Sequence, residues 1–295
     1  MSIGVIGAGK WGSALAFALT QKNDVLINSR RVRDVSNFVS LEEILQCEYL
    51  VITVPAQQVA SWLEEHFVFH GQKILVASKG IEASSGRFLN EIYQKYVPDE
   101  NIAFLSGPSF ATEVMQSLPT ALVINSHNES LAENFAALFP SFIKTYTSTD
   151  VIGAEISGAY KNVIAIAAGI CSGLELGNNA AAALISRGLV EMDRFGRAYG
   201  AKEETFLGLS GAGDLFLTAS STMSRNFRVG LGLAKGLSQE EILTELGEVA
   251  EGIGTAYALH DIAKKSDLYL PIAREVHAML EGKSPKESLR DLLTH

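Results

Sequence analysis

The stretch SIGVIGAGKWGSALAFA, at residues 2–18, is the part of the sequence that decides the fold. The apolar run at residues 3–6 is typical of a buried strand, and residues 14–19 are typical of a closely packed helix. Between them, Gly7, Gly9 and Gly12 have the spacing G-x-G-x-x-G. In a strand–turn–helix unit, such glycines permit the tight turn, let a pyrophosphate approach the backbone and let the helix pack on the strand. The helix N-terminus then presents N–H groups and a positive dipole end to the phosphates. We therefore predict a dinucleotide site here; a glycine-rich turn of another α/β protein is the alternative.

The composition indicates a globular chain without a basic surface. The chain has 295 residues, of which 47% are hydrophobic and 19% are charged. This length suggests about two domains, and this composition argues against disorder. The formal net charge of −9 differs from the basic footprint of nucleic-acid-binding proteins, so no nucleic-acid partner is expected.

The remaining composition signals predict a soluble cytoplasmic protein. The two cysteines, Cys47 and Cys171, form no disulfide framework and fit a reducing compartment. No signal peptide precedes the first predicted strand. The longest apolar stretch, around residues 163–170, is too short and too rich in Ala and Gly to span a bilayer, so no stable membrane insertion is expected.

The first half of the chain alternates predicted strands with helices. Alternation of this kind predicts a mostly parallel sheet. The fold class is therefore α/β, with an N-terminal, Rossmann-type, doubly wound domain over residues 1–148. Further strands are predicted at residues 24–28, 49–54, 73–77, 102–106, 120–125 and 142–147, and helices at 57–66 and 131–139.

The pattern changes near Asp150, beyond which no strand is predicted. Apolar residues then recur at helical spacing, so an all-helical domain is expected over residues 149–295. Asn178 or Asn179 is a candidate cap for the second long helix, and Ser238 with Glu241 forms a capping-box pattern. Helices are predicted at 151–174, 180–199, 225–234, from 238 onward, at 254–264, 271–280 and 285–293.

The end of the second predicted strand favours NADP over NAD. NAD-binding sites usually have an Asp or Glu here for the ribose 2′-hydroxyl, but this chain has Asn28, followed by Ser29, Arg30 and Arg31. Two guanidinium groups suit a 2′-phosphate better than a hydroxyl. We predict NADP as the preferred cofactor and NAD as the alternative. A solvated surface position is the other interpretation of these arginines, above all of Arg31.

Two further strands end in segments suited to ligand binding. Lys79 follows the strand at residues 73–77, and the turn Gly107-Pro108-Ser109 follows the strand at 102–106. Ligands of open α/β sheets bind at the carboxyl ends of the strands. Lys79 is therefore well placed for substrate or cofactor, with a surface charge as the alternative.

Candidate chemistry in the second half begins with Lys161. This residue lies about 200° around its predicted helix from Val163, off the apolar stripe, by the helical period. Taken alone, the pattern favours a solvated surface lysine.

A glycine-rich loop, GLSGAGD at residues 208–214, precedes a short apolar segment that contains Thr218. Ser224, Arg225 and Asn226 then lie at the start of a predicted helix. An Arg and an Asn at a helix N-terminus combine charge, side-chain donors and amide donors, which suits a phosphate. An ordinary helix cap with a surface arginine is the alternative.

Together these segments resemble the bacterial NAD(P)-dependent glycerol-3-phosphate dehydrogenase family. The similarity covers essentially the whole chain and rests on seven motifs in the family's order. They are GAGKWGSALA from Gly7, SKGI from Ser78, GPSFA from Gly107, YKNVIAIAAG from Tyr160, GLSGAGDLFLT from Gly208, SRN from Ser224 and VAEGIGTA from Val249.

The resemblance implies a role for each matching position. Lys161 matches the catalytic lysine, Asp214 its acidic partner at the substrate, and Thr218 a threonine close to it. Lys79 matches a lysine shared by cofactor and substrate. The other substrate positions are Gly107, Ser109, Ser224, Arg225 and Asn226. The other cofactor positions are Trp11, Arg30, Ala111, Arg225, Val249 and Glu251.

Three positions depart from the family pattern. Lys10 lies where Ser or Thr is usual, so the resemblance leaves its contact with the cofactor open, and a phosphate contact of its ammonium is the alternative. Tyr160 lies where leucine is common. Ala219 lies where cysteine is common.

The resemblance further implies the reaction and its setting. The reaction is hydride transfer between NAD(P)H and dihydroxyacetone phosphate, giving sn-glycerol 3-phosphate for glycerophospholipid synthesis, in a homodimer. A lysine can give the developing alkoxide both positive charge and a proton, so no metal is expected. A nearby Lys79 and burial would lower the pKa of Lys161, whereas Asp214 would raise it.

Two other functions remain open from the sequence. One is a related two-domain reductase of another small acid, such as a ketopantoate-like substrate. The other is a non-catalytic dinucleotide sensor. The six histidines lie outside the motifs and are interpreted as surface or packing residues, and no Cys/His cluster has metal-ligand spacing.

Overall fold

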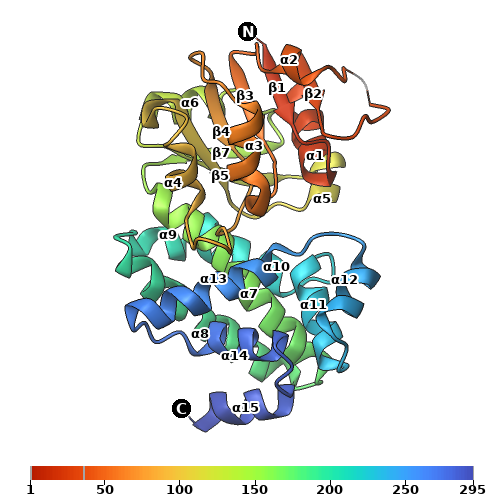
Figure 1. Cartoon of the computed structure of the whole chain (residues 1–295), viewed down its shortest axis with the longest axis vertical. Helices are drawn as coiled ribbons and strands as arrows, with labels where there is room; N and C mark the ends of the chain where they lie inside the picture. The colour runs from red at the N-terminus through yellow and green to blue at the C-terminus, as the bar shows by residue number, and fades with distance from the viewer. Residues whose placement is uncertain (1, 36, 295) are drawn as a thin grey trace. The chain divides into compact units, whose positions relative to one another are not determined.

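The computed structural model describes residues 2–35 and 37–294 and divides them into two compact units (Figure 1). Unit 1 contains the chain up to Lys79 and residues 89–154. Unit 2 contains residues 80–88 and the chain from Glu155 onward. The assignment of residues 80–88 to unit 2 has no counterpart in the sequence pattern, which suggests a single division near residue 148.

Unit 1 is built on a seven-stranded sheet in the order β2-β1-β3-β4-β5-β6-β7. All neighbouring strands are parallel except β5 and β6, so the predicted mostly parallel α/β fold is confirmed. The order reverses at β1, which lies between β2 and β3, and this is where such folds bind ligands. The strands are β1 (Ile3–Ile6), β2 (Val25–Asn28), β3 (Tyr49–Ile52), β4 (Lys73–Val76), β5 (Ile102–Ser106), β6 (Thr120–Asn125) and β7 (Ile143–Ser148).

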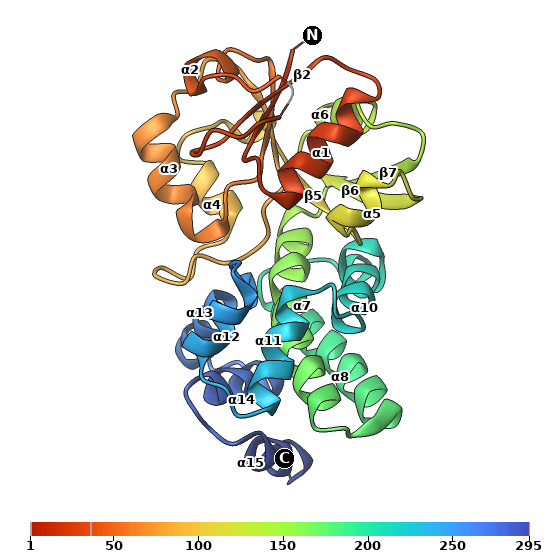
Figure 2. The same ribbon diagram turned by 90° about the vertical axis from the view of Figure 1, so that its right-hand side faces the viewer.

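Helices cover both faces of this sheet, which is why its central strands are continuously apolar (Figure 2). One core contains Leu15 and Phe135 from α1 and α6, and the other contains Leu63 and Tyr93 from α3 and α4. The helices on the first face are α1 (Lys10–Thr20), α5 (Ala111–Met115) and α6 (Glu129–Ala136). Those on the second face are α2 (Leu41–Ile44), α3 (Val59–His66) and α4 (Leu89–Tyr93), with the short 3-10 helices η1 (Ala56–Gln58) and η2 (Asp99–Asn101) nearby in the chain.

Unit 2 is helical, as predicted, and no strand of the sheet lies beyond β7 in the part of the chain described to residue 294. Its helices are α7 (Val151–Gly173), α8 (Gly177–Ala198), α9 (Glu203–Leu207), α10 (Asp214–Ala219), α11 (Arg225–Ala234), α12 (Gln239–Leu246), α13 (Glu251–Ser266), α14 (Pro271–Leu280) and α15 (Pro285–Thr294), with a π-helical turn η3 (Leu209–Gly213) before α10.

Local sequence signals predict the start of α12 correctly and the start of α8 wrongly. The capping box of Ser238 and Glu241 is present at the start of α12. The predicted cap of α8 is wrong, because the helix begins at Gly177 and Leu176 is its N-cap. Asn178 and Asn179 therefore lie in the first turn rather than before it.

The helix α7 belongs to unit 2 from Glu155 onward and is the core helix of that unit. By length and composition it is the one helix in the described part of the chain that could cross a membrane, but 94% of its apolar window is buried inside the protein. A buried core helix can have the same length and composition, so this helix is weak evidence for a membrane span.

Candidate active site

Lys161 is buried and paired, so the preference of its isolated helix pattern for the surface is wrong. Its side chain is 10% exposed, and Nζ lies 2.5 Å from Oδ1 of Asp214, whose side chain is 2% exposed. Nζ also donates to Oγ1 of Thr218 at 3.0 Å. Burial of an ammonium is costly unless a counter-charge and hydrogen bonds accompany it. Asp214 supplies that charge from 53 residues away, which a local pattern cannot show.

The partners of Lys161 lie on a single short helix. Asp214 is the first residue of α10, and Thr218 follows one turn later on the same face. The hydroxyl of Thr218 also approaches the same Oδ1, at 3.3 Å. Lysine, carboxylate and hydroxyl thus form one buried polar group, and its ammonium can stabilise a developing oxyanion and donate a proton.

The predicted phosphate residues lie at the N-terminus of α11. Ser224 is the N-cap, and its Oγ accepts a hydrogen bond from the N–H of Phe227 at 3.2 Å. Oδ1 of Asn226 accepts a hydrogen bond from the N–H of Gly252 at 3.0 Å. The carbonyl side of Asn226 is therefore bound to the first turn of α13, and its amide NH₂ is the group that can donate to a ligand.

The first turn of α13 lies between the two groups. A Cβ added to Gly252 would lie 2.7 Å from Oδ1 of Asn226 and 2.9 Å from the carbonyl oxygen of Asn162. Asn162 is the neighbour of Lys161 in α7. The structure therefore brings the α7 backbone beside Lys161, the N-terminus of α11 and the N-terminus of α13 together within unit 2. Two helix N-termini at one place favour an anion.

Arg225, Val249 and Glu251 lie around these helix ends. The guanidinium of Arg225 is partly exposed, with Nη1 3.7 Å from Oε2 of Glu248. Val249 is 53% exposed, and Glu251 is the first residue of α13.

Glycines hold α11 against α7. A Cβ on Gly230 would lie 2.0 Å from the carbonyl oxygen of Ile166, and one on Gly169 would lie 2.0 Å from that of Phe227. The two backbones are therefore in direct contact, which fixes the N-terminus of α11 relative to the helix that carries Lys161.

In unit 1, the glycine turn after β1 fits a dinucleotide. Gly7 has φ +109°, a conformation that favours glycine. A Cβ on Gly12 would lie 1.7 Å from the carbonyl oxygen of Gly7, whereas the space at Gly9 is open within 4 Å. Gly9 is the N-cap of α1 and has no side chain for capping, so phosphate oxygens are natural acceptors for the first-turn N–H groups.

The two residues that follow Gly9, Lys10 and Trp11, lie in the first turn of α1. The indole Nε1 of Trp11 donates to the carbonyl oxygen of Ala77, just beyond β4, at 3.0 Å. Lys10 is exposed at the first position of α1.

The segments after β4 and β5 meet, as their positions at the sheet edge predict. Nζ of Lys79 donates to the carbonyl oxygen of Gly107 at 3.2 Å. Oγ of Ser109 lies 3.4 Å from the same oxygen, and Ala111 opens α5. Gly107 has φ +102°, so this turn needs glycine.

Arg30 and Arg31 are exposed after β2. Asn28, at the position that an acidic residue has in NAD-binding sites, is buried, and its Nδ2 donates to the carbonyl oxygen of Val39 at 2.7 Å. The exposed guanidinium groups of Arg30 and Arg31 are therefore available to a ligand phosphate, whereas the amide of Asn28 is not. Among the described residues, no group of three or more His, Cys, Asp or Glu side chains is placed to hold a metal ion.

Comparisons with known proteins assign the family. The sequence models for the N-terminus and the C-terminus of NAD-dependent glycerol-3-phosphate dehydrogenase match residues 32–132 and 150–290. The protein named glycerol-3-phosphate dehydrogenase [NAD(P)+] of Sulfurimonas denitrificans is 74% identical over 99% of both chains. The chain belongs to the NAD-dependent glycerol-3-phosphate dehydrogenase family.

Other members of the glycerol-3-phosphate dehydrogenase family agree in sequence and in fold. The relative from Nitratiruptor sp. is 61% identical over 99% of this chain and 98% of its own. The crystal structure of the Coxiella burnetii enzyme has a TM-score of 0.91 at 32% identity and covers 100% of this chain and 99% of its own. The family match therefore extends over both units.

One residue that contacts the glycine turn, Thr53, was not among the predicted residues. Oγ1 of Thr53 donates at 3.0 Å to the carbonyl oxygens of both Ile6 and Gly7, so it holds the glycine turn from the neighbouring strand. The available signal was its place between β3 and Pro55, at the carboxyl end of a strand beside β1.

Proposed function

We propose that this chain reduces dihydroxyacetone phosphate to sn-glycerol 3-phosphate with NADPH or NADH, and catalyses the reverse reaction. The observation that carries the proposal is the buried contact of Lys161 with Asp214 and Thr218, close to the N-termini of α11 and α13. This arrangement offers a proton donor for a carbonyl oxygen and a separate anion site for a phosphate. The full-length similarity to proteins named glycerol-3-phosphate dehydrogenase [NAD(P)+] supports the same substrate.

Lys161 is the proposed general acid and base. Its ammonium stabilises the negative charge that develops on the C2 oxygen and donates a proton to it. Asp214 and Thr218 hold Nζ in place. The bound cofactor supplies the hydride that C2 receives.

Binding of the substrate phosphate is proposed to position C2. Arg225 and the amide NH₂ of Asn226 bind its oxygens at the N-terminus of α11, which Ser224 caps. Binding energy from this remote group fixes the geometry of the reacting carbon and so lowers the barrier. Lys79, Gly107 and Ser109 are the proposed substrate contacts of unit 1.

Residues of both units are proposed to bind the cofactor. Gly7, Gly9, Lys10, Trp11 and Gly12 bind the pyrophosphate region. Arg30 and Arg31 bind the 2′-phosphate, and this favours NADP over NAD. The further cofactor contacts are Lys79, Ala111, Arg225, Val249 and Glu251.

The proposed setting follows from the family. We propose a cytoplasmic homodimer without stable membrane insertion that makes glycerol 3-phosphate for phospholipid synthesis. Residues 1–148 form its proposed cofactor-binding domain and residues 149–295 its substrate domain.

The test is oxidation of NADPH, and separately of NADH, by the purified chain with dihydroxyacetone phosphate. Dihydroxyacetone without the phosphate and ketopantoate serve as comparison substrates. Rapid oxidation with dihydroxyacetone phosphate alone supports the proposal. Oxidation with ketopantoate alone points to the related reductase, and NADPH binding without turnover of any ketone points to the sensor.

A further inference from the structure

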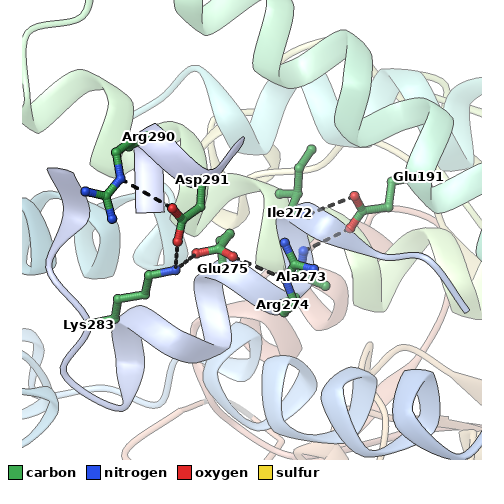
Figure 3. A network of polar contacts seen from close by, with 8 residues as sticks. All are labelled: Glu191, Ile272, Ala273, Arg274, Glu275, Lys283, Arg290 and Asp291. Atoms are coloured by element: carbon green, nitrogen blue, oxygen red, sulfur yellow. Dashed lines mark hydrogen bonds and ion pairs between the residues drawn. The ribbon is translucent and has the colours of Figure 1, made fainter. Parts of the chain in front are cut away.

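A second buried carboxylate, Glu191, lies in α8 outside the proposed chemistry. It is 2% exposed. Its Oε2 accepts a hydrogen bond from the N–H of Ile272, and its Oε1 accepts one from the N–H of Ala273, each at 2.9 Å (Figure 3). Both N–H groups belong to the first turn of α14, where the helix dipole favours a negative charge. Glu191 therefore binds α8 to the N-terminus of α14.

The third donor to Glu191 is the residue beside the proposed catalytic lysine. The hydroxyl of Tyr160 donates to Oε1 at 2.8 Å, and the Tyr160 side chain is fully buried. Its ring packs on Phe195 of α8, with the centroids 5.5 Å apart. Glu191 thus holds α7 at the position directly before Lys161.

These contacts close a ring of interactions around Lys161. Lys161 contacts Asp214 and Thr218 on α10, and α10 packs against α8. From α8, Glu191 returns to α7 through Tyr160. The contacts with α8 and with α10 are therefore made by two consecutive residues of α7, Tyr160 and Lys161.

We propose that Tyr160 and Glu191 form a positioning pair for Lys161: they fix α7 relative to the α8–α10 layer, and so align Nζ with the substrate oxygen. The inference rests on the proposed function for its catalytic consequence, but the alignment is a property of the unliganded protein. A buried carboxylate with three donors suits this task, because buried polar contacts are directional where apolar packing is not.

Another buried carboxylate, Glu275, lies in α14 and has different partners from those of Glu191. It is also buried, and it pairs with Lys283 and Arg274 (Figure 3). Lys283 in turn binds Asp291, so this group joins α14 to α15. None of these contacts reaches α7, which makes Glu275 the matched control for Glu191.

The kinetic test compares Tyr160→Phe and Glu191→Gln with the controls Tyr199→Phe and Glu275→Gln. Tyr199 belongs to the same aromatic cluster, with its ring 5.0 Å from that of Phe195. Small misplacements of a reacting group cost up to about 100-fold in rate, and we expect kcat to fall about 5- to 20-fold in the two test variants. KM for both substrates should change less than about twofold, because the phosphate and dinucleotide sites are intact. Unchanged kcat in both test variants, or equal losses in the controls, would overturn the proposal.

A second measurement works without turnover. Competitive acetylation with trace acetic anhydride, read by mass spectrometry, compares Lys161 with the exposed Lys95 in each protein. We expect the relative labelling of Lys161 to rise several-fold in Tyr160→Phe and Glu191→Gln and to stay at the wild-type value in the controls. Equal labelling of Lys161 in all five proteins would overturn the positioning role. If the wild-type chain turns over no ketone, the proposed function fails, and this labelling alone decides the positioning role.

Discussion

Lys161 and Asp214 form a buried ion pair between α7 and α10, with Nζ 2.5 Å from Oδ1. Removal of one partner from such a pair leaves an uncompensated charge, which is strongly destabilising. The pair is therefore a costly element of unit 2, and the α7 backbone next to it contacts the first turn of α13, so we interpret the pair as part of the chemistry rather than as a source of stability.

The first prediction concerns Lys161→Met. Methionine fills similar space but has neither the charge nor the proton, so turnover should fall by at least about 100-fold. NADPH binding, measured by fluorescence titration, should be unchanged because Lys161 is not among the proposed cofactor contacts. Lys95→Met, at an exposed position, is the control. Turnover within about twofold of wild type would exclude Lys161 as the general acid.

The second prediction concerns Arg225→Ala. Loss of a charge-assisted hydrogen bond to the substrate phosphate, worth about 1.5–3 kcal/mol, should raise KM for dihydroxyacetone phosphate by about 10- to 100-fold. Lys235→Ala removes a cation from the other end of α11 and should leave KM unchanged. An Arg225→Ala enzyme with wild-type KM would place the phosphate elsewhere.

The third prediction concerns Arg30→Ala. If Arg30 binds the 2′-phosphate, its loss should raise KM for NADPH by about tenfold and leave KM for NADH unchanged, because NADH lacks that phosphate. Arg33→Ala, a nearby exposed arginine, is the control. Equal effects on both cofactors would show that Arg30 has no part in the discrimination.

Features with a local cause could be predicted from the sequence. The glycine spacing after β1 gives the turn and α1 because each glycine acts on its own backbone or on the adjacent helix. The bounds of α11 and α14 match the prediction because Ser224 and Pro271 are local start signals. Position at a strand end or a helix start identified Lys79, the turn at Gly107 and the residues from Ser224 to Asn226, whereas Lys161 was identified only by the resemblance to a known family.

Features that depend on distant partners could not be predicted. The burial of Lys161 requires Asp214, and the anchoring of Tyr160 requires Glu191, 31 residues away. Residues 80–88 belong to unit 2, where Phe88 is buried and its ring lies 5.2 Å from that of Tyr199. In each case, tertiary packing overrides a local pattern that has no information about the partner.

The fourth prediction concerns the contact of α7 with α11. Gly230→Ala would place a Cβ 2.0 Å from the carbonyl oxygen of Ile166, so the helices must separate. Overpacking of this kind costs about 1–3 kcal/mol, and the midpoint of urea unfolding should fall accordingly. In Gly232→Ala, two residues along, the new Cβ meets the side chain of Ile242, which can move, so a smaller loss is expected. Equal losses in the two variants would contradict this interpretation.

The last prediction is a pH dependence that belongs to Glu191. Burial raises the pKa of its carboxyl, although the N–H groups of Ala273 and Ile272 and the hydroxyl of Tyr160 oppose the shift. The folded chain therefore binds this proton more tightly than the unfolded chain, and the free energy of unfolding falls as pH rises from the ordinary pKa of a glutamate, about 4.3, to the raised value. Glu191→Gln removes this titration. The free energy of unfolding of Glu191→Gln minus that of wild type should therefore increase from pH 4 upward and then become constant.

Other titrating groups are common to both proteins, so they cancel in that difference. Thermal unfolding of the two proteins between pH 4 and pH 8 measures it, and a difference that is constant or moves against the variant would contradict the burial argument. A variant that gains stability at neutral pH but loses turnover would show that the wild-type chain retains a costly carboxylate for the alignment of Lys161, since sites that need fixed geometry often reduce stability.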